Sequence, residues 1–110
     1  MKSFTLTRVA NQRITLTVDE NTYGFRFRTF NEMLFADVEI NGAAVAYGVR
    51  CCPYSFIIPY RYMEQKGNFF FTSEDGKYPT YKDFGGGVVL AYIPHDQLDD
   101  MRKRWVRLHR

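Results

Sequence analysis

The dipeptide Asn41-Gly42 constrains the fold of this chain more than any other feature of its sequence. It separates two segments, FADVEI (35–40) and AAVAYGVR (43–50), that are both long enough to be strands. Both central residues of a type I′ turn need a positive φ, which asparagine and glycine tolerate. The dipeptide therefore predicts a two-residue hairpin that joins these segments as antiparallel strands.

Alternation of apolar and polar residues predicts further strands before this hairpin. The segments ITLTV (14–18) and YGFRFRT (23–29) both alternate, and DENT (19–22) has the acidic and asparagine residues of a turn. The side chains expected to face the core are Ile14, Leu16, Val18, Tyr23, Phe25, Phe27, Ala36, Val38 and Ile40. In the strand after the hairpin, one face is expected to hold Val45, Tyr47 and Val49.

The second half of the chain combines a crossover, two strands and a helix. Two prolines in CCPYSFIIPY (51–60) exclude a regular central strand and predict a crossover along a sheet edge. GNFFF (67–71) reads as a short strand, and VVLAYI (88–93), apolar on both faces, predicts a central strand covered on both sides. After Pro94 the apolar residues follow a helical spacing, at Leu98, Met101, Trp105 and Leu108.

These elements predict a mainly β protein with one domain. Residues 1–93 are expected to form a single compact antiparallel β-sandwich or barrel of about seven strands. Residues 94–110 are expected to add one C-terminal basic amphipathic α-helix as an extension of the same domain. The length of 110 residues and the hydrophobic fraction of 45% are sufficient for one core. We expect neither a membrane span nor an export signal.

Positive charge is concentrated at the C-terminus. The net charge of +3 depends on Met101–Arg110, which holds five basic residues and no acid, whereas residues 1–100 hold ten basic and twelve acidic residues. Such a basic helix face can be solvated, can dock on a protein partner, or can contact phosphate or lipid.

The cysteines and histidines do not form a recognised site. Cys51 and Cys52 are adjacent, so a disulfide between them would be strained. We expect two reduced thiols that pack as small apolar side chains at the end of a strand, in a protein that folds in a reducing cytoplasm. His95 and His109 are fourteen residues apart and are not expected to act as a ligand pair, and neither has a zinc-site spacing to the cysteines.

Two other patterns resemble chemical sites. Asp37 and Glu39 share the outward face of their strand, where an acid–base pair is conceivable but a solvated face is the simpler explanation. The triple glycine 85–87 lacks the lysine and hydroxyl residue of a phosphate-binding loop, and its glycines more simply supply a positive φ or a bulge. We therefore predict that the protein is not an enzyme and has no catalytic residue, no cofactor and no metal.

Aromatic residues alternate with basic ones in FRFR (25–28) and PYRY (59–62). Most of these rings are expected in the core, because burying a Phe stabilises a fold by about 1.5–3 kcal/mol. The alternative is a small OB-like or SH3-like barrel that stacks single-stranded nucleic acid on its rings, with phosphate contacts from Arg26, Arg28, Arg61 and the basic tail. A protein interface is the third possibility, because aromatic and arginine side chains dominate interface energies. Its candidate residues are Tyr60, Tyr62, Tyr78, Tyr81, Phe84, Arg102, Arg104, Trp105 and Arg107.

The order of features from Phe4 to Ile93 resembles the cyanophage-type plug family, the small baseplate plug proteins of contractile-tailed bacteriophages. The resemblance rests on Asn11-Gln12, Tyr23, Asp37, Asn41-Gly42, Gly48, Arg50, Pro53, Gly67-Asn68, Asp75, Tyr78-Pro79, Tyr81, Phe84-Gly85 and Leu90-Ala91-Tyr92. The segment after Pro94 is longer than the usual family ending, so the resemblance implies nothing about the helix.

The resemblance implies a structural role in the virion. A plug of this family would sit at the distal end of the tail tube, near hub and spike, and would help to close the channel and hold the baseplate together. Its partners would be other baseplate proteins (hub, spike, tail tube or wedge), with several copies in a symmetric assembly. The resemblance implies no small-molecule substrate, no membrane contact and no specific nucleic-acid binding, in a protein made and assembled in the host cytoplasm. In the stretch 67–87, it implies a strand followed by a shaped turn.

Overall fold

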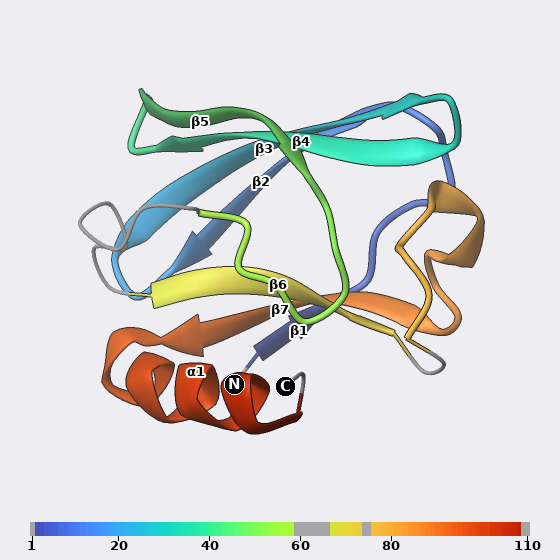
Figure 1. Ribbon diagram of the computed structural model, residues 1–110. Helices are drawn as coiled ribbons and strands as arrows, with labels where there is room; N and C mark the ends of the chain where they lie inside the picture. The colour runs from blue at the N-terminus through green and yellow to red at the C-terminus, as the bar shows by residue number, and fades with distance from the viewer. Residues whose placement is uncertain (1, 59–66, 74–75, 109–110) are drawn as a thin grey trace.

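The computed structural model describes residues 2–58, 67–73 and 76–108, with side chains described up to Lys103. Seven strands and one helix lie within these residues (Figure 1). They are β1 (Lys2–Phe4), β2 (Gln12–Val18), β3 (Asn21–Phe30), β4 (Met33–Ile40), β5 (Ala43–Arg50), β6 (Gly67–Ser73), β7 (Val88–Pro94) and α1 (His95–Leu108). A short 3₁₀-helix, Tyr81–Asp83, precedes β7.

The strands form two antiparallel sheets that pack face to face as a sandwich (Figure 1). One sheet has the strand order β2-β3-β4-β5 and the other has the order β1-β7-β6. Helix α1 packs on the outer face of the three-stranded sheet, so the layers are helix, sheet and sheet. The mainly β prediction is confirmed as a sandwich, and no closed barrel is found among the described strands.

Two-residue turns join the strands of the four-stranded sheet. Asn41 and Gly42 have φ values of 52° and 86°, so the predicted hairpin is confirmed. The Asn41 side chain accepts a hydrogen bond from the Thr22 N–H at 2.9 Å and donates one to Asn21 Oδ1 at 2.9 Å. These bonds tie two neighbouring turns together. Both turn residues also have positive φ in the other two hairpins, at Asp19-Glu20 and Asn31-Glu32.

The predicted face of β5 is wrong at Tyr47, whose side chain is 70% exposed. Val45 and Val49 both pack against the core, so these two lie on one side of the sheet, as predicted. The register between β4 and β5 shifts twice, and each shift gives β5 more residues than the strand that it pairs with. Such bulges change the phase of the alternation. The second bulge contains Gly48, whose φ of 61° favours glycine.

The main core lies between the two sheets and is rich in aromatic rings. Phe69 on β6 is fully buried, with ring centroids 4.8 Å from Tyr23, 4.8 Å from Phe25 and 5.0 Å from Tyr92. All nine side chains that were predicted to face the core do so. Ile14 and Leu16 are half-buried against it, and the other seven are buried. The core therefore contains most of the described phenylalanines, as the sequence predicts.

Strand β7 is central and is covered on both faces. Its residues Ala91 and Ile93 contact Phe70 and the helix residue Leu98 in a second, smaller core. Tyr92 faces the other way, into the main core. The doubly covered strand and the amphipathic helix are both confirmed. Within the described residues, no helix has the length and apolar character needed to cross a membrane.

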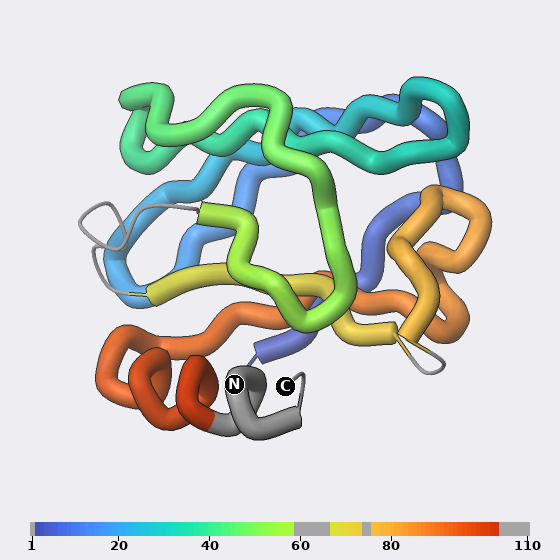
Figure 2. Tube along the Cα trace, viewed as in Figure 1, coloured from blue at the N-terminus to red at the C-terminus, as the bar shows by residue number. Residues whose placement is uncertain are grey.

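The segment Cys51–Ile58 crosses from β5 in one sheet to the free edge of β6 in the other (Figure 2). The Tyr54 N–H donates to the carbonyl of Phe71 at 3.0 Å, and the Ile57 N–H donates to the carbonyl of Phe69 at 2.9 Å. The predicted crossover along a sheet edge is confirmed as far as Ile58.

A buried hydroxyl connects the two sheets. Tyr92 on β7 is 1% exposed, and its hydroxyl donates a hydrogen bond of 2.7 Å to Asp19 in the β2–β3 turn. Burial, and to a smaller degree this hydrogen bond, raise the pKa of Tyr92. The hydroxyl therefore stays protonated and keeps donating well into the alkaline range.

The adjacent cysteines lie in different environments, and this difference predicts their reactivity. Cys51 is buried and Cys52 is half-buried, and both are free thiols. Burial raises the pKa of the Cys51 thiol, which suppresses its thiolate. In native protein we expect a thiol reagent to modify Cys52 alone, whereas both thiols should react in denaturant. Mass spectrometry of the modified Cys52→Ser variant checks this, because fast native labelling of that variant would contradict the burial of Cys51.

Candidate protein interface

The loop between β6 and β7 holds three of the residues predicted for an interface. Tyr78 is 53% exposed, and the guanidinium of Arg50 lies 4.5 Å above the centre of its ring. Tyr81 is half-buried against the main core. Phe84 is only 2% exposed and stacks on Phe71 with a centroid distance of 6.0 Å. Only Tyr78 is therefore well placed to meet a partner, and Phe84 belongs to the core.

The remaining candidates lie on the crossover and the helix. Tyr60 and Tyr62 are outside the described residues. Arg102 on α1 lies with its guanidinium 4.7 Å above the ring centre of Phe56, so it covers the crossover. The other helix candidates lie on α1, but their side chains are outside the described part of the chain: Arg104, Trp105 and Arg107.

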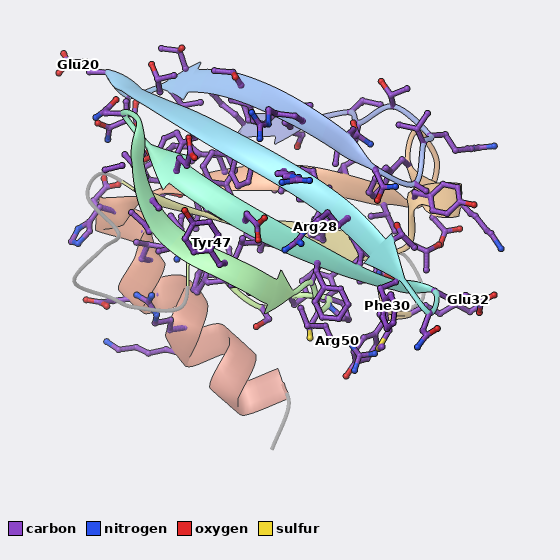
Figure 3. The ribbon with its side chains drawn as sticks, turned by 90° about the horizontal axis from the view of Figure 1, so that it is seen from above. Glu20, Arg28, Phe30, Glu32, Tyr47 and Arg50 are labelled. Carbon is purple, nitrogen blue, oxygen red and sulfur yellow. The ribbon has the colours of Figure 1, made fainter. Side chains whose placement is uncertain are left out.

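The outer face of the four-stranded sheet brings aromatic and arginine side chains together, and all of them except the half-buried Phe35 are exposed. Arg28, Phe35 and Arg50 are cross-strand neighbours on β3, β4 and β5. Phe30, 67% exposed, ends β3 beside this row, and Figure 3 shows it at the same end of the sheet as Arg50. With Tyr78, which stacks on Arg50, these residues form what we call the aromatic–arginine patch (Arg28, Phe30, Phe35, Arg50 and Tyr78).

Some of the charged side chains on this face make bonds that stabilise the fold. Arg28 makes an ion pair of 2.9 Å with Asp37, and the same carboxylate oxygen accepts the Gly48 N–H at 2.7 Å. Asp37 therefore holds the β5 bulge and orients Arg28. Asp37, one member of the conceivable acid–base pair with Glu39, is therefore used by the fold.

An open depression of about 360 Å³ lies over the middle of the same face. Its lining residues are Arg13, Thr15, Gly24, Phe25, Arg26, Asp37, Glu39 and Tyr47. Within the described parts of the chain, no group of three or more His, Cys, Asp or Glu side chains is placed to hold a metal ion.

Several residues that carry the family resemblance hold the architecture. The buried Asn68 side chain accepts the Ile58 N–H and donates to the Ile58 carbonyl, both at 3.0 Å, and so fixes the crossover to β6. Asn11 accepts the Thr29 N–H at 3.1 Å, and Gln12 donates to the Thr7 carbonyl at 2.6 Å. These polar side chains hold loops and strand ends in place.

The structure adds Phe30, Phe35 and Arg50 to the candidates for an interface, and the sequence prediction did not name them as such. A signal for Phe30 was present, because it continues the outward face of β3 after Arg26 and Arg28. The sequence near Arg50 does not predict its contact with Tyr78, because Tyr78 is distant in sequence. The two side chains meet only because of the direction in which the crossover runs.

Comparison with known proteins identifies the family. A family model described as "Cyanophage baseplate Pam3 plug gp18" matches residues 1–96 of the 110-residue chain. The matched region contains both sheets and the start of α1, and most of the helix lies beyond it. No curated protein matches the sequence. Because the match covers far more than half of the chain, this protein belongs to the cyanophage baseplate plug family.

Proposed function

We propose that this protein is a rigid plug at the distal end of the tail tube of a contractile-tailed phage, next to the hub and spike. Its work is mechanical: it fills the central space, helps to close the channel and holds neighbouring baseplate subunits in place. The observation that carries the proposal is the family match over residues 1–96, which gives the chain a structural role in the phage tail baseplate. The proposal includes no catalytic step, and assembly would take place in the host cytoplasm.

The fold suits a part that must keep its shape under load. The two sheets enclose interlocked aromatic rings, and tight two-residue turns close all three hairpins of the larger sheet. Interiors packed in this way deform little. A plug also needs surfaces that bind protein, and the aromatic–arginine patch has the residue types that dominate protein interfaces.

The single-strand alternative finds no support. The chain matches a plug family, and its sheets form a sandwich rather than the OB-like or SH3-like barrel which that alternative assumed. Arg28, one of its proposed phosphate contacts, is already paired with Asp37.

The proposed interface predicts the behaviour of a Phe30→Ala, Arg50→Ala double variant. Both side chains lie on the outer surface, so the melting temperature should change little. Loss of one interface hot spot costs at least about 2 kcal/mol, which corresponds to a roughly 30-fold weaker association. We therefore expect the variant to be depleted from purified baseplates, as measured by quantitative mass spectrometry against the hub protein.

The matched control is Lys103→Ala, which removes an exposed cation from α1, on the opposite layer of the molecule. It should leave incorporation unchanged. Normal incorporation of the double variant would show that another surface binds the baseplate. Absence of the wild-type chain from purified virions would overturn the plug role itself.

A further inference from the structure

The sandwich has four edge strands, and only one of them is long, regular and uncovered in the described part of the chain. The crossover covers β6, two bulges interrupt β5, and β1 has three residues. Strand β2 has seven residues, pairs with β3 without a register shift, and contains no proline or lysine. Natural proteins usually protect such an edge, because its free backbone groups can pair with another chain.

The direction of the free backbone groups of β2 follows from Thr22 on the neighbouring strand. The Thr22 N–H donates to Asn41 and its carbonyl accepts the Asn41 N–H, so both groups point away from β2. Thr22 lies opposite Thr17, which is therefore in a non-hydrogen-bonded pair. Because this pattern repeats every two residues, Arg13, Thr15 and Thr17 all direct their N–H and carbonyl groups to the open edge.

A groove lies beside this edge, where the two sheets separate between β1 and β2. Its volume is about 550 Å³. Three half-buried apolar side chains line it, those of Phe4, Ile14 and Leu16, and the walls are completed by the buried Leu6, by Gln12 and by Ser and Thr residues. A strand added next to β2 would point every second side chain into this groove and would cover these three side chains.

The positive charge of the arginines beside the edge favours an incoming strand that carries a carboxylate. Arg13 lies directly opposite Arg26, and like charges in this position repel. On the next strand, β4, Asp37 lies opposite Arg26, but its carboxylate is paired with Arg28. A second depression, of about 460 Å³, is lined by these three arginines together with Asn11, Gln12 and Phe27. A carboxylate next to Arg13 would relieve this repulsion.

We infer that β2 receives an extended segment of a neighbouring baseplate protein as a fifth strand of the larger sheet. The segment pairs with the backbone of Arg13, Thr15 and Thr17, places apolar side chains at alternate positions in the groove, and presents an Asp or Glu to Arg13. The inference rests on the proposed function for the source of the segment. The edge and its groove are properties of this chain alone.

A second copy of this chain fits the edge less well. Two paired β2 strands would place the alternate Ile14 and Leu16 side chains of one copy beside those of the other, so the apolar requirement alone does not exclude a second copy. Neither β2 strand contains a carboxylate to offer Arg13. A foreign strand with the stated pattern satisfies both requirements.

The edge can be probed in assembled virions with a photoreactive benzophenone amino acid at position 17. The control position is 44 on β5, where Ala44 is exposed on the same sheet three strands away from β2. We expect a cross-link from position 17, and not from position 44, to an alternating segment of another baseplate protein, identified by mass spectrometry. A cross-link to another copy of this chain would overturn the foreign-strand inference.

Substitutions test the backbone pairing directly. Thr15→Pro removes a donor that the isolated fold does not use, so the melting temperature should stay close to wild type, whereas incorporation into baseplates should fall about tenfold. Thr15→Val keeps the N–H and should incorporate within about twofold of wild type. If the proline variant does not fold, Arg13→Glu serves instead and should also reduce incorporation.

The outcomes separate the two proposals. Normal incorporation of a folded Thr15→Pro variant, or of Arg13→Glu, together with no cross-link from position 17, would overturn strand addition and leave the plug role intact. Absence of the wild-type chain from purified baseplates would overturn the plug role, and with it the source of the segment.

Discussion

Asn68→Ala is expected to lower the free energy of unfolding by about 3 kcal/mol or more. The Asn68 side chain is fully buried and bonds both the N–H and the carbonyl of Ile58, and it also accepts the N–H of Phe69 at 2.7 Å. Alanine would leave these buried groups without their partner and would release the crossover from β6. Urea denaturation should show a lower midpoint at a nearly unchanged slope.

The matched control for this variant is Asn11→Ala. Asn11 also accepts a backbone N–H, that of Thr29, but its bond is exposed and water can replace it. We expect this control to cost no more than about 1 kcal/mol. An equal loss of unfolding free energy in the two variants would mean that burial does not determine how much the Asn68 hydrogen bonds stabilise the fold.

Gly67→Ala is expected to lower the free energy of unfolding by a comparable amount, for a steric reason. A Cβ on Gly67 would lie 2.5 Å from the Ile93 carbonyl oxygen and 2.5 Å from Cζ and the hydroxyl of Tyr92. Overpacking usually costs about 1–3 kcal/mol, and the upper end applies here because a backbone atom of the central strand cannot move aside. The displaced Tyr92 would also lose its bond to Asp19. A thermal melt followed by near-UV circular dichroism would measure both effects.

Gly24→Ala is the control for this variant, because Gly24 is also a strand glycine whose φ lies outside the left-handed region. Its added Cβ would meet Glu39 atoms at 3.7 Å, which is ordinary contact. We expect a neutral or slightly stabilising change, within about 1 kcal/mol. A Gly67→Ala variant as stable as Gly24→Ala would contradict the close packing of β6 on Tyr92.

Much of the fold was predictable because it depends on local patterns. Alternation placed the inward rings of β3, the Asn41-Gly42 pair placed one hairpin, and the change of period after Pro94 placed the helix. The error at Tyr47 has a definite cause. Bulges depend on how two strands fit one another, as when Asp37 binds the N–H of Gly48, and a single strand's pattern does not contain that information.

The candidate interface was less predictable, since residue type alone does not distinguish a core ring from a surface ring. Tyr78 and Phe84 are six positions apart in one loop, yet one is exposed and the other is buried. The stacking of Arg50 on Tyr78 and the row of Arg28, Phe35 and Arg50 depend on strand order and register. Strand order and register depend on the whole chain, so no single segment of the sequence predicts them.

The hydrogen bond from Tyr92 to Asp19 has a mechanical consequence. It joins the central strand of one sheet to a turn of the other, so the two sheets cannot slide along one another without breaking it. A force along the strands would therefore be shared between the layers rather than shear them apart. Tyr92→Phe should leave the resting shape intact and make the protein yield at a lower pulling force.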